Sequence, residues 1–460
     1  MISRFFLSYT ILLLCSINML QAQQTSLSIK TNTPGALVRL ITYDDLLNWH
    51  GKTLAQEHTD EQGMVSFVVD LDVSKPAHIA LDLDRVDLVL KPGASYKLII
   101  RKDLQQGNLS YFDKVPPALI FEQTNDDDLQ ARLEAVDMLV NSFLIDNFQS
   151  LYRLQRYHLL DSLQQMIDQT TGNGASAYTK AYAQYKFAAV ILAVKRNGKA
   201  LVINDYYKDK EVLYRNEPYM VLFSELFSDY LFSNRFLAME SLREMDWKSY
   251  LEWRDYLRND PLLEKDSRLA ELIVLASLKH FYRDTRFNRN DVINYLEYLK
   301  SNALFEEHRQ MAENTINKLL FLAPGTGAPH FELIDQHGKV VKGTDFSNSL
   351  VVIQFVNADC PTCEAGLQQM KELLNLIEAD IQLITISTAD SYTHYQSLFA
   401  SRDYKWPLLN LGEKILLPEE FNVKTYPELI LINRQSKIGM APAPQEEAAL
   451  LFHINRLLSN

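Results

Sequence analysis

The sequence predicts a multidomain chain in three parts: an N-terminal antiparallel β-sandwich, a central all-α region and a C-terminal α/β domain. Short runs of β-branched and aromatic residues, separated by turn residues, fill residues 23–105. Apolar residues recur every three or four positions over residues 126–321, which is the period of a helix with one buried face. Over residues 326–460, strand-like and helix-like runs alternate, which is the pattern of a sheet covered by helices.

The composition is that of a globular protein with an acidic balance. Of the 460 residues, 47% are hydrophobic and 23% are charged, which is ordinary for folded domains and argues against a largely disordered chain. With 46 Lys and Arg against 58 Asp and Glu, the formal net charge is −12. Binding to nucleic acid needs a positive surface that displaces counterions from phosphates, so we predict no nucleic-acid partner.

Residues 1–22 have the features of a secretory signal peptide. Arg4 supplies a positive charge, residues 5–14 form a mostly apolar run, and Ala22 is a small residue near which cleavage is expected. The alternative is an uncleaved membrane anchor, but the apolar run is shorter than the ~20 residues that a spanning helix needs. We therefore predict export to the periplasm or cell envelope, with removal of this segment.

The region from residue 23 to residue 105 carries the signals of a small all-β domain. The expected strands are 38–43, 65–71, 78–83, 86–90 and 96–100. Turn residues separate them, among them the Pro-Gly pairs at 34–35 and 92–93. Short strands at close and regular spacing favour an antiparallel sandwich.

From residue 126 to residue 321 the period of the apolar residues changes to that of helices. One of several such runs consists of Leu129, Leu133, Val136, Leu139 and Phe143. Glycine, proline and asparagine residues interrupt the pattern, and we predict about eight helices between them. We interpret the apolar and aromatic faces as core, because helical periodicity usually marks packing rather than a binding site.

The cysteines carry the functional signal. The chain has 3 of them, and Cys15 lies in the predicted signal peptide, so the mature chain keeps only Cys360 and Cys363. In oxidising compartments, structural disulfides normally close long loops. A bond across two intervening residues closes almost no loop and contributes little chain entropy to stability. The pair therefore fits chemistry better than a structural role.

The surroundings of the pair favour a reactive thiolate at Cys360. A strongly apolar strand at 350–356 leads to the pair, and a helix is expected to begin at Cys360. Free backbone N–H groups and the positive end of the helix dipole stabilise a thiolate there, and the thiolate is the nucleophile. Pro361 suits the first helical turn because it needs no N–H partner. We predict that Cys360 attacks a substrate and that Cys363 resolves the mixed disulfide.

Four segments of the C-terminal part resemble, in this order, the motifs of one family. They are GAPHFEL at 327–333, DQHGK at 335–339, CPTC at 360–363 and TYPE at 425–428. Together they resemble the thioredoxin fold, and specifically the TlpA-like periplasmic thioredoxins that reduce disulfides. The resemblance covers residues 326–460.

The resemblance implies a thioredoxin fold whose redox group is the Cys360–Cys363 disulfide, with no further cofactor and no metal. It implies a cis peptide bond at Pro427, which would face the disulfide. It also implies a backbone edge at Tyr426 that pairs with an extended substrate. Thr362, between the cysteines, is expected to support substrate binding.

Three residues depart from the family pattern. Asp359 stands where the family usually has Trp, and Glu364 where a basic residue often follows the second cysteine. Two carboxylates beside the pair oppose the helix dipole and should raise the pKa of the thiols, which favours the disulfide form and predicts a reductant. Gln354 stands where thioredoxin has a buried acid, so it cannot accept a proton. It either hydrogen-bonds near Cys363 or is a satisfied buried amide, and the sequence leaves both open.

Two segments of the N-terminal part resemble domains found in other proteins. Residues 59–67 resemble a hairpin of carboxypeptidase-regulatory-like sandwich domains, and residues 91–96 resemble the N-terminal domains often fused to thioredoxin-like proteins of Bacteroidetes. They imply a Bacteroidetes-type N-terminal extension. Three roles remain open for this extension: it could present a substrate, restrict access to the disulfide or hold the protein near a partner.

Three other interpretations of the cysteine pair remain. A zinc half-site would need about four ligands, and His330, His337 and His394 are not clustered in the sequence. A peroxidase would carry Thr three residues before its cysteine, where this chain has Asn357. A cell-envelope binding module with a vestigial, non-cycling thioredoxin fold would keep the motifs without the chemistry.

We therefore predict an exported thiol–disulfide oxidoreductase that reduces protein disulfides through Cys360 and Cys363. Its partners would be proteins with thiols or disulfides and a membrane-borne electron donor, because no nicotinamide or flavin motif is present in the sequence. The sequence predicts neither the substrate nor the oligomeric state.

Overall fold

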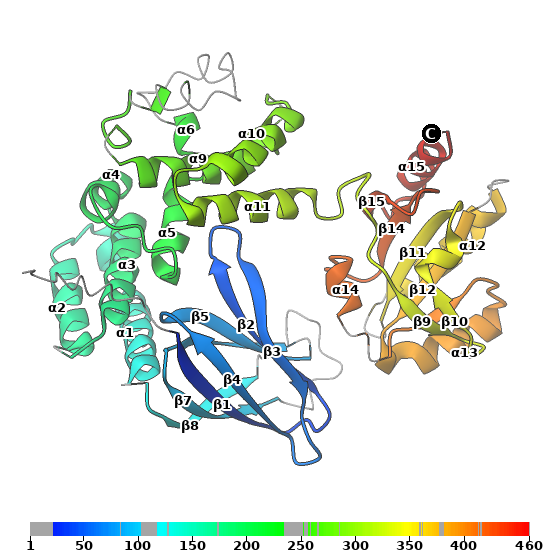
Figure 1. The fold of residues 1–460 in the computed structure, drawn as a ribbon, viewed down its shortest axis with the longest axis horizontal. Helices are drawn as coiled ribbons and strands as arrows, with labels where there is room; N and C mark the ends of the chain where they lie inside the picture. The colour runs from blue at the N-terminus through cyan, green and yellow to red at the C-terminus, as the bar shows by residue number, and fades with distance from the viewer. Residues whose placement is uncertain are drawn as a thin grey trace, which may run out of the picture.

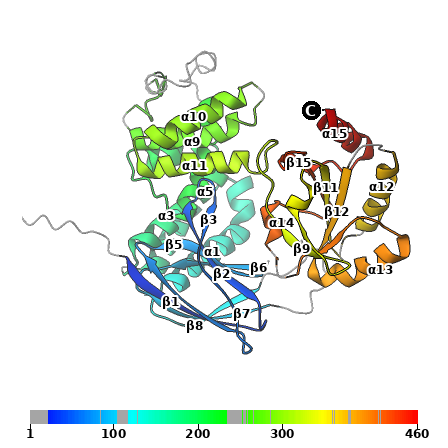
Figure 2. The same cartoon turned by 45° about the vertical axis from the view of Figure 1, so that its right-hand side comes forward.

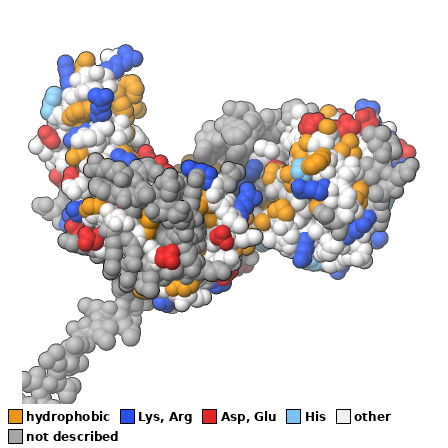
Figure 3. Space-filling view, turned by 90° about the horizontal axis from the view of Figure 1, so that it is seen from above, with side chains coloured by type: hydrophobic (Ala, Val, Ile, Leu, Met, Phe, Trp, Pro, Cys, Tyr) orange, Lys and Arg blue, Asp and Glu red, His pale blue; other side chains and the backbone are white. Residues whose placement is uncertain are grey.

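The computed structural model describes residues 22–460 with several gaps. The residues left out are 83, 103–116, 127, 173, 234–251, 253–255, 258, 265, 285, 358–359, 361, 377–380, 413, 415 and 460. Almost all of the predicted signal peptide, residues 1–22, therefore lies outside the described residues, as do Asp359 and Pro361. The described residues form two lobes, a larger one made by the N-terminal and central parts and a smaller one made by the C-terminal part (Figures 1 and 3).

The N-terminal part consists of strands that form two sheets. The strands are β1 (Gln23–Thr31), β2 (Leu37–Asp45), β3 (His50–His58), β4 (Met64–Leu71), β5 (Lys75–Leu81), β6 (Asp84–Leu90), β7 (Ser95–Arg101) and β8 (Ala118–Thr124). One sheet has the order β4-β1-β7-β8 and the other the order β3-β2-β5-β6. Figure 2 shows the strands of this part below the helices of the central part. Buried and exposed residues alternate along strands such as β4, so one face of the sheet is buried. The buried residues of both sheets form one apolar core. The prediction of a sheet-rich N-terminal part is confirmed.

The arrangement departs in two ways from an antiparallel sandwich over residues 23–105. β1 and β7 run parallel, with Leu27 opposite Tyr96, whereas the other neighbouring strands of the two sheets are antiparallel. β8 pairs with β7 and lies beyond residue 105. No residue of β8 is fully buried and β3 is mostly exposed, so neither strand has the apolar alternation by which a sequence reveals a strand.

The central part is helical, as predicted. Its helices are α1 (Leu129–Phe148), α2 (Leu159–Thr171), α3 (Ala177–Val194), α4 (Gly198–Val202), α5 (Glu217–Phe227), α6 (Tyr230–Ser233), α9 (Ser267–Phe281), α10 (Arg289–Asn302) and α11 (Glu306–Leu320), with π-helical turns η2 (Gln149–Arg153) and η3 (Ile203–Tyr207). Asp266, directly before α9, accepts a hydrogen bond from the N–H of Leu269, which fixes where this largely buried helix begins. Within the described ranges, no helix is long and apolar enough to span a membrane.

A hairpin of the N-terminal part is inserted into the helical part. The turn between β2 and β3 points towards α11 (Figure 1), and its Leu46 and Leu47 are buried in the core of the helices. Asn48 is also buried, and its side-chain amide donates to the hydroxyl of Thr315 at 2.9 Å. Lys279 on α9 donates to the carbonyl of Leu47 at 2.9 Å. The inserted turn therefore completes the core of the helices, and this ties the N-terminal sheets and the helices into one unit.

The C-terminal part is a mixed sheet packed against helices. Its elements are β9 (Glu332–Asp335), β10 (Val340–Lys342), η4 (Gly343–Phe346), β11 (Leu350–Val356), α12 (Cys363–Leu376), β12 (Ile381–Ser387), η5 (Ala389–Ser391), α13 (Tyr392–Arg402), β13 (Leu408–Asn410), α14 (Leu417–Glu420), β14 (Glu428–Ile432), β15 (Ile438–Ala443) and α15 (Glu447–Ser459). The seven strands have the order β10-β9-β13-β12-β11-β14-β15. β11 is fully buried, parallel to β12 and antiparallel to β14. Helices α12, α13 and α15 pack on one face and α14 on the other, as expected for a thioredoxin-like domain.

The two lobes touch between β2 and α14. Arg39 of β2 and Glu419 of α14 form an ion pair at 3.4 Å. Beside it lies a cavity of about 370 Å³, lined by Leu37 from the larger lobe and by Phe331 and Leu417 from the smaller. An ion pair with a largely exposed carboxylate contributes little to stability, so this contact is weak compared with the inserted hairpin.

Candidate redox site

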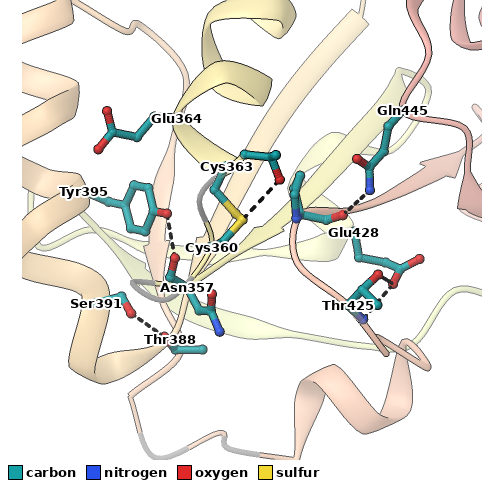
Figure 4. The surroundings of a disulfide bond; sticks show 12 residues. Asn357, Cys360, Cys363, Glu364, Thr388, Ser391, Tyr395, Thr425, Glu428 and Gln445 are labelled. Atoms are coloured by element: carbon teal, nitrogen blue, oxygen red, sulfur yellow. Dashed lines mark hydrogen bonds between the residues drawn. A yellow bond between two sulfur atoms is a disulfide. The ribbon is translucent and has the colours of Figure 1, made fainter. Parts of the chain in front are cut away.

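The redox pair lies where β11 ends and α12 begins. Cys360 and Cys363 are joined by a disulfide with an S–S distance of 2.06 Å (Figure 4). Cys363 is fully buried and Cys360 is 8% exposed, so a thiol group outside the protein meets the sulfur of Cys360 first. This asymmetry is the one that an attacking Cys360 and a resolving Cys363 require.

Helix α12 begins at Cys363, and not at Cys360 as we predicted. The N–H of Cys363 donates to the carbonyl of Cys360 at 3.3 Å, and the N–H of Gly366 donates to the carbonyl of Thr362 at 2.9 Å. A single turn thus joins Cys360 to the N-terminus of the helix, where the positive end of the helix dipole still acts on its sulfur. The hydroxyl of Thr362 lies 3.8 Å from the same sulfur and can donate to a thiolate there.

The loop between α14 and β14 lies beside the helix that carries Cys363. The Tyr426–Pro427 peptide bond is cis, as the resemblance implied. Pro427 is buried, and a Cβ placed on Gly366 of α12 would lie 3.6 Å from the ring of Pro427. Tyr426 packs against both cores of the domain, and burial raises its pKa. Because residues three apart share a helix face, the loop lies on the same side of α12 as Cys363.

Two side chains that sequence reasoning missed hold this loop (Figure 4). Glu428 is largely buried, and its Oε2 accepts hydrogen bonds at 3.3 Å from the N–H groups of Lys424 and Thr425 and from the Thr425 hydroxyl. Gln445 donates from its side-chain amide to the carbonyl of Pro427 at 2.6 Å. Glu428 could have been predicted from the sequence, since it is the last residue of the TYPE motif. Gln445 does not belong to any motif.

Gln354 lies beneath α12 on the interior strand β11. It shares a face of β11 with Val352 and Val356, which belong to the core under α12. The residue is 1% exposed, and its Oε1 has no hydrogen-bond partner among the described residues. A Cβ placed on Gly366 would lie 2.8 Å from Gln354 Nε2, so the glycine provides the space that this amide occupies.

Glu364 does not stand alone beside the pair. Its carboxylate lies 3.1 Å from Nε2 of His394 on α13, and both side chains are about half exposed. Figure 4 places Glu364 on the α13 side of the disulfide, near Tyr395. Water and His394 therefore share its charge, and its effect on the thiols is smaller than that of an unpaired carboxylate. Asp359, the other predicted carboxylate, lies outside the described residues.

Tyr395 fixes the chain just before the disulfide. It is buried on α13, and its hydroxyl donates to the carbonyl of Asn357 at 2.7 Å (Figure 4). Burial, with a smaller contribution from the charge of Glu364, raises the pKa of Tyr395 to about 12. The hydroxyl thus stays protonated at neutral pH and remains a donor. Sequence reasoning missed Tyr395 because it lies far along the chain, on a helix without a motif.

The histidines considered for zinc lie in different places. His394 pairs with Glu364, and His330 lines the cavity between the lobes. In the part of the chain that the structure describes, no group of three His, Cys, Asp or Glu side chains is placed to hold a metal ion. Both sulfur atoms are engaged in the disulfide.

Comparison with known proteins concerns only the C-terminal part. Residues 324–440 match the AhpC/TSA family, and no curated protein matches the chain. The thioredoxin domain of a thiol-disulfide oxidoreductase from Bacteroides vulgatus is 20% identical, over 29% of this chain and 98% of that one, with a TM-score of 0.27. The pneumococcal exposed lipoprotein thioredoxin from Streptococcus pneumoniae is 25% identical, over 28% of this chain and 100% of that one, with a TM-score of 0.25.

Proposed function

We propose that this chain, whose C-terminal part is a thioredoxin-like oxidoreductase domain, is an exported enzyme that reduces disulfide bonds in other proteins. The disulfide itself carries the proposal. It closes almost no loop, so it can open without loosening the fold, and Cys360 is slightly exposed whereas Cys363 is fully buried. The TlpA-like subfamily and the Bacteroidetes-type extension belong to the same proposal and rest on the sequence motifs.

The chemistry needs two thiol–disulfide exchanges. In the reduced enzyme, the thiolate of Cys360 attacks one sulfur of a substrate disulfide, forms a mixed disulfide and releases one substrate thiol. The thiolate of Cys363 then attacks the sulfur of Cys360, which releases the second substrate thiol and closes the enzyme disulfide. Two electrons pass to the substrate. A dithiol donor must return them, and we expect it at the membrane of the exporting cell.

The reducing direction rests on the carboxylates next to the pair. Asp359 and Glu364 oppose the dipole of α12, which disfavours thiolates and so favours the disulfide form of the enzyme. The pairing of Glu364 with His394 weakens the part of this effect that comes from Glu364. Export to the periplasm or cell envelope rests on residues 1–22, and the protein thiol partners rest on the slight exposure of Cys360.

The reduction potential of the pair tests the proposal directly. The purified mature protein would be equilibrated in dithiothreitol or glutathione buffers, and the oxidised fraction read by mass spectrometry after thiol alkylation. We expect a reversible couple near that of thioredoxin, about −270 mV. A value near about −120 mV would make the protein an oxidant and reverse the proposed direction. A pair that never opens would leave a binding module with an idle disulfide.

Single-cysteine variants test the two roles. In Cys363→Ser, the mixed disulfide cannot be resolved, so we expect a covalent complex with a disulfide substrate on a non-reducing gel. In Cys360→Ser, the remaining sulfur is buried, and we expect no complex and no turnover. Equal trapping by both variants would contradict the assignment of Cys360 as the attacking sulfur.

A further inference from the structure

We infer that Gln445 and Gln369 are positioning residues, which set the cis-proline loop against the redox helix so that an extended peptide substrate can pair with the loop. This inference rests on the proposed function. It concerns how the site distinguishes a disulfide on a peptide chain from a small free disulfide. Neither glutamine touches the sulfur atoms, so both act through the backbone of the loop.

The first observation is a gap in the ladder between β14 and β15. The pairing of the two strands reaches Leu429 opposite Ala443 and continues no further towards the disulfide. Continued by antiparallel register, it would set Pro444 opposite Glu428 and Gln445 opposite Pro427. Pro444 has no N–H, so the ladder loses a backbone donor where the loop approaches the redox pair.

The side chain of Gln445 contacts the loop just beyond this point. Its Nε2 donates to the carbonyl of Pro427 at 2.6 Å. A bond to this carbonyl fixes the orientation of the peptide unit that follows Pro427. Glu428 fixes the other end of the loop through the N–H groups of Lys424 and Thr425. Tyr426 lies between these two anchors, so its backbone has a defined direction.

The second glutamine connects the loop to the redox helix. Gln369 of α12 donates from its Nε2 to the backbone carbonyl of Gln445 at 3.0 Å. Helix α12 begins at Cys363, so a continuous path leads from the resolving cysteine through Gln369 and Gln445 to Pro427. The loop edge and the disulfide therefore keep one relative position, which an extended substrate needs if it is to meet both at once. A small disulfide needs only the sulfur of Cys360.

Gln445→Ala tests the inference in single-turnover reactions of the full, pre-reduced protein. The probe is a synthetic extended peptide whose cysteine is joined to glutathione by a disulfide, and the released peptide thiol is measured. We expect the peptide concentration for half-maximal rate to rise about fivefold, the effect of one lost hydrogen bond, with the maximal rate little changed. Gln369→Ala should shift it in the same direction.

A neighbouring glutamine supplies the matched control. Gln368 lies on the same helix, but its amide donates to Glu372 on the surface at 2.9 Å and does not reach the loop. Gln368→Ala should leave the half-maximal peptide concentration unchanged. If Gln445→Ala also leaves it unchanged, or if Gln368→Ala raises it as much, the positioning role is wrong.

Gln445→Glu gives a readout that a merely structural role would not produce. At neutral pH its carboxylate cannot donate to the Pro427 carbonyl, so we expect a half-maximal concentration at least as high as in Gln445→Ala. The maximal rate should stay near the native value, because this side chain acts only through the loop backbone. A native half-maximal concentration in Gln445→Glu would overturn the inference. Native protein that releases no peptide thiol at all would overturn the proposed function as well.

Discussion

Gly366 and Gln354 occupy adjoining space below the redox pair. The glycine sits in the first turns of α12, where alanine would normally favour the helix by about 0.5–1 kcal/mol. Here a Cβ would come within 2.8 Å of the buried amide of Gln354. Replacing Gly366 by alanine would therefore stabilise the helix and at the same time create a steric conflict. Measurements of the free energy of unfolding can tell which effect is larger.

We predict that Gly366→Ala destabilises the C-terminal lobe by about 1–3 kcal/mol, because an overpacked core must displace the amide. The measurement is the free energy of unfolding in urea. Gln354→Ala removes the opposing side chain, so the double variant should recover most of the loss caused by Gly366→Ala. A stabilising Gly366→Ala would mean that the amide moves away at little cost.

At this scale the sequence predicts the residues that stand in motifs. Cys360 and Cys363 follow from their spacing, and the cis bond at Pro427 follows from a family resemblance. Tyr395 and Gln445 do not belong to a sequence motif. Each donates a hydrogen bond to a backbone carbonyl, and any side chain with a donor at that position could do the same. Their partners are set by the tertiary structure, which the local sequence does not contain.

The inserted hairpin brings a lysine into an unfavourable place for a charge. Lys279 lies on α9 and donates to the carbonyl of Leu47 at the tip of the β2–β3 turn. Burial, with a further contribution from the charge of Lys318, lowers the pKa of Lys279 to about 8. An unfolded chain holds the same proton up to a pKa of about 10.4.

The pH dependence of stability follows from this difference. Between about pH 8 and about pH 10.4 the unfolded chain binds the proton that the folded protein has released, so the free energy of unfolding rises with pH. We predict that the free energy of unfolding of the native protein rises by about 3 kcal/mol relative to that of Lys279→Met across this window, at about 1.4 kcal/mol per pKa unit. Chemical unfolding at a series of pH values measures it. Lys208→Met, at an exposed position, is the control and should run parallel to the native protein.

Elements with a strong apolar pattern are the ones that the sequence places well. The buried strand β11 has the bounds that its apolar run predicts, whereas β3 and β8 have no such run. The parallel pairing of β1 with β7 could not be predicted, because periodicity gives the faces of a strand and not its neighbour. The start of α12 was wrong because the CPTC motif forms a turn before the helix.

The molecule consists of two lobes, although the sequence divides into three regions. Composition and periodicity divide the chain into three regions, in the order that the structure confirms. The insertion of Leu46 and Leu47 into the helical core joins the first two regions. Between the lobes, the ion pair of Arg39 with a half-exposed Glu419 is of the kind that contributes about 1 kcal/mol or less.

Calorimetry should therefore resolve two unfolding transitions and not three. One belongs to the sheets with the helices, and the other to the C-terminal lobe. Asn48→Ala removes buried hydrogen bonds of the inserted hairpin and should lower the midpoint of the first transition by about 2–4 °C per kcal/mol lost, with the second unchanged. Separate transitions for the sheets and the helices would contradict the view that the inserted hairpin makes them one unit.

The inserted hairpin also bears on how such a chain can change over generations. The chain passes from the larger lobe to the smaller after α11, so recombination near that point transfers the redox domain intact. A recombination point between the sheets and the helices would separate Leu46 and Leu47 from the helical core in which they are buried. They must be inherited together, and an insertion in the β2–β3 turn would have to be matched by changes in α9 and α11.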